Sequence, residues 1–145
     1  MRARTIVCGA GIAALFICGF AADALADPHG LWLTEGGKSH VELGSCKRDE
    51  QRLCGKIVWL RKPRRDVKND DESLRDRDLV GIDVVWDLKH EGEGMWDDGE
   101  IYNPEDGETY DSEMEVIDAD TVEVSGCVWF ICKTQTWKRV ERDGS

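Results

Sequence analysis

The chain has 145 residues, and its 30 acidic residues against 19 basic ones give a formal net charge of −11 at pH 7. This length suits one domain with a single core. An acidic surface repels phosphate backbones and anionic lipid headgroups, which argues against a protein that binds nucleic acid.

The N-terminus has the pattern of a secretory signal peptide. Arg2 and Arg4 precede an uncharged run over residues 6–22, and Ala24-Leu25-Ala26 forms an A-x-A cleavage signal directly before Asp27. The alternative is a transmembrane anchor, but the run is at the short limit for crossing a bilayer and ends in small residues.

We therefore predict a signal peptide over residues 1–26 and one domain over residues 27–145, with cleavage between Ala26 and Asp27. The mature chain loses two Arg and one Asp and keeps 17 basic and 29 acidic residues, a net charge of −12. We expect no transmembrane segment in it, because no later stretch is apolar enough. The protein is expected in the periplasm or outside the cell.

The mature chain contains four cysteines, an even number that predicts two disulfides in an exported protein. Of the three possible pairings we favour the local ones, Cys46–Cys54 and Cys127–Cys132, because each pair flanks a predicted hairpin reversal. Each bond is expected to stabilise the fold by about 2–3 kcal/mol. A zinc site is the alternative, but neither pair has C-x-x-C spacing.

Short alternating or β-branched stretches, separated by turn residues, predict a series of β-strands. In chain order they cover residues 30–34, 40–44, 53–60, 82–89, 100–103, 109–116, 121–125 and 133–140. The turn Pro104-Glu105-Asp106-Gly107 is well specified, because Pro presets φ, Asp bonds its own backbone and Gly accepts positive φ.

Residues 61–78 form the longest connection, which is highly charged and contains Pro63. Ser73 is expected to cap a single helical turn that runs through Arg77. Connections of this length are commonly functional or mobile. We interpret this one as a crossover or a lid across one end of the fold.

About eight short strands joined by hairpins predict an all-β fold. Such a meander hides its edges best by closing, so we predict an antiparallel up-and-down barrel with one long charged loop. Eight strands leave an interior that side chains fill or that holds one small ligand.

Several patches together resemble a bacterial family of small exported proteins that is catalogued as a domain of unknown function. The patches are Gly30–Thr34, Leu53–Leu60, Leu74–Arg77, Trp96–Tyr110 and Lys133–Val140. The resemblance covers nearly all of the mature chain and implies a lipocalin-like barrel. It implies no activity, because the family has no agreed one.

Gly30-Leu31-Trp32 also looks like the G-x-W signature in the first strand of lipocalins. In that family the Trp plugs the closed end of the barrel, and an Arg or Lys of the last strands packs over its ring. The resemblance implies that Trp32 is the plug here and that Arg139 or Lys138 covers it through a cation–π contact.

The mature chain has six Trp, which either fill the core or line a cavity for a small apolar or amphipathic ligand. The residues expected to line such a cavity are Ile57, Trp59, Val84, Trp86, Tyr110 and Met114.

Trp129 and Phe130 lie within the Cys127–Cys132 loop at a predicted hairpin tip. If exposed, they form a contact point for a partner protein or a membrane, and the alternative is that they pack back on the barrel.

Other kinds of site find little support. None of His29, His40 and His90 has metal-ligand spacing, and the acidic stretch 66–72 lacks the EF-hand pattern, so we expect no metal and no cofactor. There is no G-x-S-x-G motif or phosphate-binding Gly loop. A buried acid/base pair such as Asp83 with Glu113 stays open, but an enzyme is the less favoured class.

Overall fold

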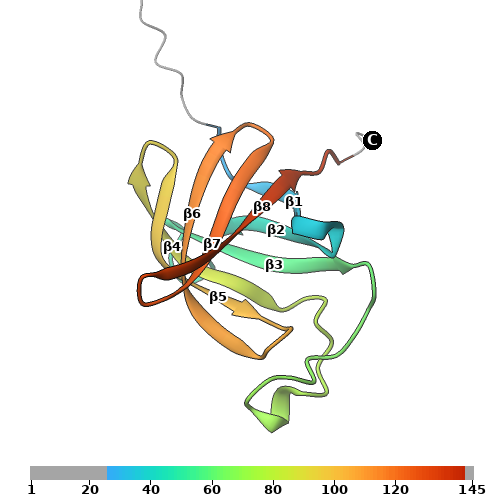
Figure 1. Cartoon of the computed structure of the whole chain (residues 1–145). Coiled ribbons are helices and arrows are strands. Elements are labelled where there is room, and N and C mark those ends of the chain that lie inside the picture. Colours follow the sequence, from blue (N-terminus) through green and yellow to red (C-terminus); the bar gives the residue numbers. More distant parts are fainter. Residues whose placement is uncertain (1–25, 143–145) are drawn as a thin grey trace, which may run out of the picture.

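The computed structural model describes residues 26–142, so the predicted signal peptide, apart from Ala26, lies outside the described residues. Within this part of the chain, no helix is long and apolar enough to cross a membrane. The described residues form one barrel with a single long connection on its outside (Figure 1).

Eight strands close into a barrel in which each strand is antiparallel to the next in sequence and β8 returns to β1. They are β1 (Gly30–Leu33), β2 (Ser39–Ser45), β3 (Arg52–Leu60), β4 (Asp83–Gly92), β5 (Met95–Asn103), β6 (Glu108–Asp118), β7 (Thr121–Val128) and β8 (Ile131–Arg139). The predicted all-β, up-and-down barrel is confirmed. A short 3₁₀ turn, η1 (Glu35–Gly37), joins β1 to β2.

Strand β5 begins five residues earlier than predicted, at Met95 instead of Glu100. Its register with β6 shifts between Trp96 and Gly99, and Asp98 has a positive φ of 58°. A bulge of this kind interrupts the alternation of side chains along a strand. The strand predicted over residues 100–103 therefore left out Met95–Gly99, which belong to β5.

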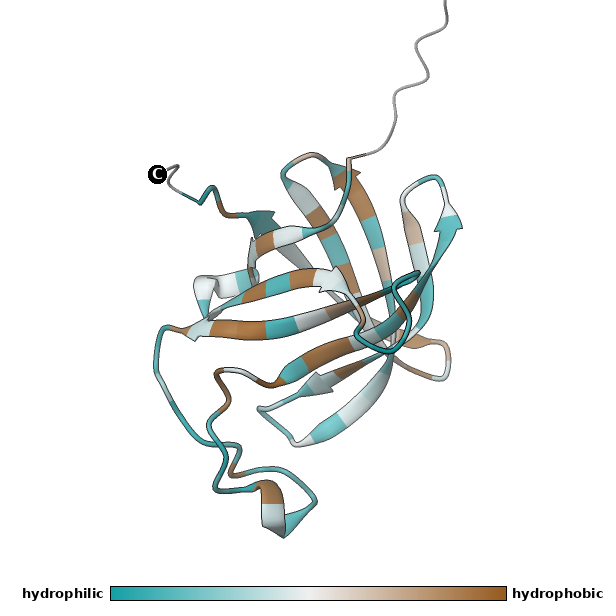
Figure 2. Cartoon of the chain, turned by 180° about the vertical axis from the view of Figure 1, so that it is seen from behind, coloured by the Kyte–Doolittle hydropathy of each residue, from teal (hydrophilic) through white to brown (hydrophobic). Residues whose placement is uncertain are grey.

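The barrel interior is filled with side chains. Hydrophilic and hydrophobic residues alternate along several strands (Figure 2), as expected where one face of a strand turns inward. The largest fully buried side chains in the barrel are Trp32, Leu53, Leu88, Met114, Val41, Val85 and Val122. A Cβ atom on Gly99 would lie 2.6 Å from Leu88 Cδ2, and one on Gly55 would lie 2.8 Å from Leu43 Cδ2. The core is therefore packed so closely at Gly55 and Gly99 that an added methyl group would contact neighbouring side chains.

Both predicted disulfides, Cys46–Cys54 and Cys127–Cys132, are confirmed. The first links the end of β2 to β3, and the second joins directly opposed residues of β7 and β8. Because all four sulfurs are in disulfides, no thiolate is left for the zinc site considered above.

The long connection between β3 and β4 projects from one end of the barrel and carries one 3₁₀ turn, η2 (Glu72–Leu74) (Figure 1). Asp71 caps this turn, because its Oδ1 accepts a hydrogen bond from Ser73 N at 2.9 Å. The prediction of Ser73 as the cap and of a turn through Arg77 was wrong. Asp71 precedes the turn and bonds two residues ahead, which is the usual N-cap geometry.

The turn between β5 and β6 supports this connection at Gly107. Gly107 has a φ of +81°, and a Cβ atom there would lie 1.9 Å from the carbonyl oxygen of Lys68. Only glycine combines this left-handed conformation with such a close backbone approach. The predicted Pro104–Gly107 turn therefore also holds the long connection.

We predict that Gly107→Ala lowers the free energy of unfolding by about 3 kcal/mol, because the methyl group adds a backbone clash to the conformational strain. Gly36→Ala is the matched control: Gly36 has a φ of +74° but no atom within 3.4 Å of the added Cβ. It should cost only about 1 kcal/mol. Urea unfolding of both variants measures this, and equal losses would contradict the contact with Lys68.

Candidate functional site

Trp32 of β1, the residue predicted to plug the barrel, lies in the buried core. Its side chain is fully buried, and its indole N–H donates to the carbonyl oxygen of Pro28 at 2.8 Å. The guanidinium carbon of Arg139 lies 4.3 Å from the ring centroid and the same group donates to the carbonyl oxygens of Asp27, His29 and Ala119. Of the two candidates for the cover, Arg139 is the one in contact with the ring.

The six residues expected to line an inner cavity are divided between the core, where Trp86 packs against the cluster that holds three of them, and the surface. Ile57, Val84 and Met114 are buried in the packed core. Trp59 is 42% exposed and lies against His40, with ring centroids 4.6 Å apart. The remaining two, Trp86 and Tyr110, are half-buried.

β-Bulges explain where two of these residues lie. In the β2–β3 ladder, Val41 pairs with Ile57 but His40 pairs with Trp59, so one extra residue separates the two positions on β3. Trp59 consequently leaves the face that Ile57 occupies.

Trp86 is displaced in the same way. Gly55 and Leu53 of β3 pair with Val85 and Leu88 of β4, which leaves the intervening Trp86 outside that pairing. Trp86 pairs instead with Glu100 of β5, and its indole N–H donates to that carboxylate at 2.7 Å. Its half-buried ring packs against the edge of the core and also lines the outer face beside the long connection.

A buried carboxylate ties the long connection to the barrel. Asp66 has no exposed surface, and one of its oxygens accepts a hydrogen bond from the Tyr102 hydroxyl on β5 at 2.5 Å. Its other oxygen accepts from Asn69 Nδ2 at 2.9 Å and pairs with the Arg77 guanidinium at 2.8 Å. Every oxygen of the buried carboxylate therefore has a partner, as a buried charge requires.

At neutral pH the Asp66 carboxyl group is ionised and the Tyr102 hydroxyl is protonated. Burial by itself raises the pKa of Asp66, but hydrogen bonds from Tyr102, Asn69 and Arg77 outweigh it and hold the pKa below the ordinary 3.8. Burial and the hydrogen bond to Asp66 raise the pKa of Tyr102 to about 12. The phenol thus stays a donor and the carboxylate stays an acceptor.

An outer groove lies between the long connection and strands β4, β5 and β6, with a volume of about 790 Å³. We call it the loop groove. Ile82, Trp86 and Tyr102 line its barrel side, and Asn69 and Arg77 line its loop side. Its carboxylates are Asp70, Asp71, Asp83 and Glu108.

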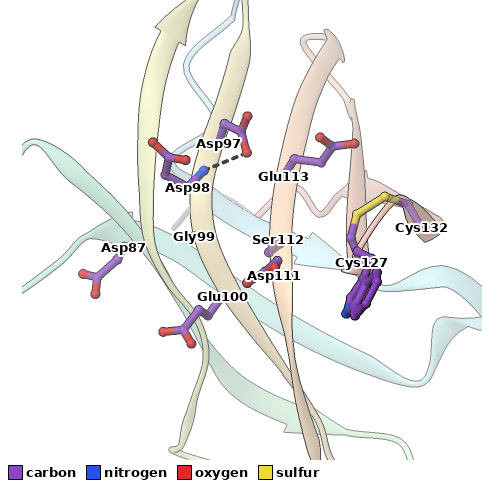
Figure 3. Close-up of a pocket in the computed structure, with 11 residues that line it drawn as sticks. Asp87, Asp97, Asp98, Gly99, Glu100, Asp111, Ser112, Glu113, Cys127 and Cys132 are labelled. Atoms are coloured by element: carbon purple, nitrogen blue, oxygen red, sulfur yellow. Dashed lines mark hydrogen bonds between the residues drawn. A yellow bond between two sulfur atoms is a disulfide. The ribbon is translucent and has the colours of Figure 1, made fainter.

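Another outer groove, which we call the acidic groove, runs over strands β4, β5 and β6 and has a volume of about 570 Å³. Figure 3 shows the acidic side chains of these strands together with the Cys127–Cys132 disulfide, which also lines the groove. The carboxylates are Asp87, Asp97, Asp98, Glu100, Asp111 and Glu113. No Lys, Arg or His lines the groove, and none of the six carboxylates is in an ion pair with another described residue.

Next to the acidic groove, the hairpin of β7 and β8 ends in four consecutive exposed apolar residues, which we call the aromatic tip. Val128, Trp129, Phe130 and Ile131 are 54%, 88%, 87% and 71% exposed. Trp129 also lines the acidic groove. Of the two alternatives left by the sequence, packing on the barrel or exposure to solvent, the tip adopts the second.

The structure also places the other residues that the sequence analysis considered for catalysis or metal binding. Asp83 lines the loop groove and Glu113 the acidic groove, so the structure does not bring these two carboxylates together as an acid/base pair. His40 and His90 lie against Trp59 and Trp96. In the acidic stretch 66–72, the side chains of Asp66, Asn69 and Asp71 bond to groups of their own loop or of β5.

Sequence reasoning missed the Asp66 cluster. Asp66 lies among many charged residues, and nothing in its neighbourhood distinguishes a buried carboxylate from a solvated one. The signal that was present was Tyr102 inside the Trp96–Tyr110 motif, because the hydroxyl of a buried tyrosine needs a hydrogen-bond partner.

Comparison with known proteins places this fold in a family. Residues 30–139 match the family described as uncharacterised protein conserved in bacteria (DUF2147). The chain belongs to this family. No curated protein matches the sequence.

Among solved structures, the chain is similar to protein HP1028 from the human pathogen Helicobacter pylori, which is described as belonging to the lipocalin family. The TM-score is 0.73 with 24% sequence identity, over 81% of this chain and 86% of that one. This similarity shows a lipocalin-like fold, in agreement with the resemblance of the sequence.

We predict that Asp66→Asn lowers the free energy of unfolding at pH 7 by about 2 kcal/mol, because an amide group turns an acceptor of the cluster into a donor. The folded pKa of Asp66 is lowered, so its contribution is present above about pH 4 and is lost as the pH falls through that lowered pKa. The deficit of the variant should therefore shrink in acid. Urea unfolding at pH 7 and at low pH measures both values.

The matched control is Asp76→Asn in the same connection. The Asp76 side chain is 95% exposed and lies 3.5 Å from Arg65, so its loss should change stability by less than about 0.5 kcal/mol. An Asp66→Asn variant as stable as this control would contradict the role of the cluster.

Proposed function

We propose that this is an exported binding protein that holds a small amphipathic molecule in the loop groove. The observation that carries the proposal is Trp86, whose half-buried ring lies in a groove of about 790 Å³. Pockets for small molecules commonly have this size and combine an aromatic or aliphatic wall with a few polar groups. Ile82 extends the apolar wall, while the Thr109 hydroxyl offers a hydrogen bond.

The charges of the groove indicate the class of ligand. Four carboxylates line it against the single guanidinium of Arg77. An anionic amphiphile such as a fatty acid would be repelled by this surplus. The proposed ligand is therefore neutral or cationic, with an apolar body that covers the Trp86 ring.

The Asp66 cluster favours binding because it holds the groove in one shape. Arg77 and Asn69 of the loop side are both bonded to Asp66, and Asp66 is bonded to Tyr102 of the barrel side. A loop that is already ordered does not lose conformational freedom when the ligand binds.

Two further observations support the proposal at a coarser level. A lipocalin-like fold is compatible with binding a small ligand. Because side chains fill the barrel interior, an outer groove is the place where such a ligand would bind. Export is proposed from the signal-peptide pattern of residues 1–26, and the two disulfides are compatible with an oxidising compartment.

The proposal predicts that the neutral probe N-phenyl-1-naphthylamine binds with a rise in fluorescence and that Trp86→Ala weakens its affinity about tenfold. Loss of an aromatic face buried by the ligand is worth about 1.5 kcal/mol or more. Because the aromatic tip can also bind an apolar probe, every protein in the titration should carry Trp129→Ser and Phe130→Ser.

Trp59→Ala is the matched control, because Trp59 is exposed on β3 and does not line the loop groove. It should leave the affinity unchanged. Loss of probe binding in Met114→Ala but not in Trp86→Ala would locate the ligand in the barrel interior and contradict the proposal. Absence of saturable binding would also contradict it.

A further inference from the structure

The aromatic tip has two features that are energetically unfavourable in a turn that faces solvent. Its four apolar side chains are more than half exposed, although Asp, Asn, Gly or Ser are the usual residues of such turns. Trp129 has a φ of 57°, a left-handed conformation that is unfavourable for a residue with a bulky side chain. A sequence selected for solubility alone would have neither feature.

The tip is held in a defined position. Cys127 and Cys132 are directly opposed in the β7–β8 ladder and are joined by a disulfide, so the turn between them is closed at its base. Val128 and Ile131 form the last pair of the ladder, which leaves Trp129 and Phe130 at the end of the hairpin. Exposed apolar residues held in place in this way are typical of binding surfaces.

The neighbouring charges decide what this surface can bind. Trp129 lines the acidic groove together with six carboxylates that have no ion-pair partner among the described residues. Bilayers with anionic lipids would be repelled by this groove, so insertion of the tip into such a membrane is disfavoured. A partner that buries the tip must approach the carboxylates, and positive charge on the partner turns that approach into an attraction.

We propose that the aromatic tip and the acidic groove together bind a basic segment of another protein, in which Lys or Arg side chains alternate with aromatic or aliphatic residues. Apolar side chains of the segment cover Phe130 and Trp129, and its cations lie over the carboxylates of β5 and β6. An Arg or Lys beside the Trp129 ring also gains a cation–π contact.

This surface is separate from the loop groove. Among the residues that line the two grooves, none is shared. The two proposals can therefore fail independently, and the variants used below leave the loop groove unchanged.

The test uses the mature protein and the peptide amide Arg-Trp-Arg-Trp-Arg in isothermal titration calorimetry. We expect saturable binding that weakens as NaCl is raised from about 50 to about 300 mM, because salt screens exposed charges. Two matched peptides separate the contributions: Glu-Trp-Glu-Trp-Glu keeps the aromatic residues, and Arg-Ser-Arg-Ser-Arg keeps the charge. Both should bind at least about tenfold more weakly.

Two variants test the two halves of the surface. Trp129→Ser with Phe130→Ser should weaken binding at least about tenfold, because aromatic residues commonly dominate such contacts. Asp111→Asn with Glu113→Gln should weaken it about fivefold, as the loss of exposed charge pairs does. Circular dichroism and thermal melting establish that both variants are folded.

The control for the charges is Glu115→Gln with Glu123→Gln, a directly opposed pair on β6 and β7 outside the acidic groove. It removes the same number of charges and should change the affinity by less than about twofold. Trp59→Ser is the control for the loss of an exposed aromatic ring and should have no effect.

Four results would overturn the proposal. The first is that the Arg-Trp peptide does not bind, and the second is that the Glu-Trp peptide binds with the same affinity. The third is that Glu115→Gln with Glu123→Gln weakens binding as much as Asp111→Asn with Glu113→Gln. The fourth is that the protein co-sediments with phosphatidylcholine vesicles through the aromatic tip while the Arg-Trp peptide does not bind. The last result would assign the tip to a neutral membrane surface.

Discussion

The width of an eight-stranded barrel is the constraint on which the rest of the structure depends. Such an interior is just wide enough for its own side chains, and here buried Leu, Val, Met and Trp residues fill it. Gly55 and Gly99 mark layers in which opposing side chains meet the backbone. Large and charged side chains that do not fit the interior therefore lie on the outer face of the barrel. Several of them lie at β-bulges, where the alternation of side chains is interrupted.

The bulges connect the filled core to both outer grooves. One between β3 and β4 leaves Trp86 beside Glu100, where the ring becomes part of the loop groove. Another in β5 sets Asp97 and Asp98 between Trp96 and Gly99, and both carboxylates line the acidic groove. Local disruptions of the ladder thus place the side chains that are available for binding.

Much of the fold was predictable because it follows from periodicity and local chemistry. The eight strands, their antiparallel order and both disulfides were expected from alternating residues, turn residues and the positions of the Cys pairs. Trp32 also had a recognisable context in Gly30-Leu31-Trp32. These features depend on neighbours in sequence, which a single chain displays directly.

The candidate site was harder to predict because it depends on events that break periodicity. Extending the alternation of β3 from Ile57 to Trp59 passes over the bulge that separates them. Asp66 meets Tyr102 only after 36 residues of chain have returned to the barrel, and no local pattern reports that contact. Exposure of Trp129 likewise depends on where the hairpin ends relative to the barrel.

The most direct test of this account is a crystal structure of the mature protein under xenon pressure. Dry apolar cavities large enough for a ligand take up xenon. A filled barrel predicts no xenon among the core side chains, which include Met114 and Leu88. A xenon atom bound inside the barrel of the unmodified protein would contradict the filled interior and return the search for a ligand to the six residues first expected to line a cavity.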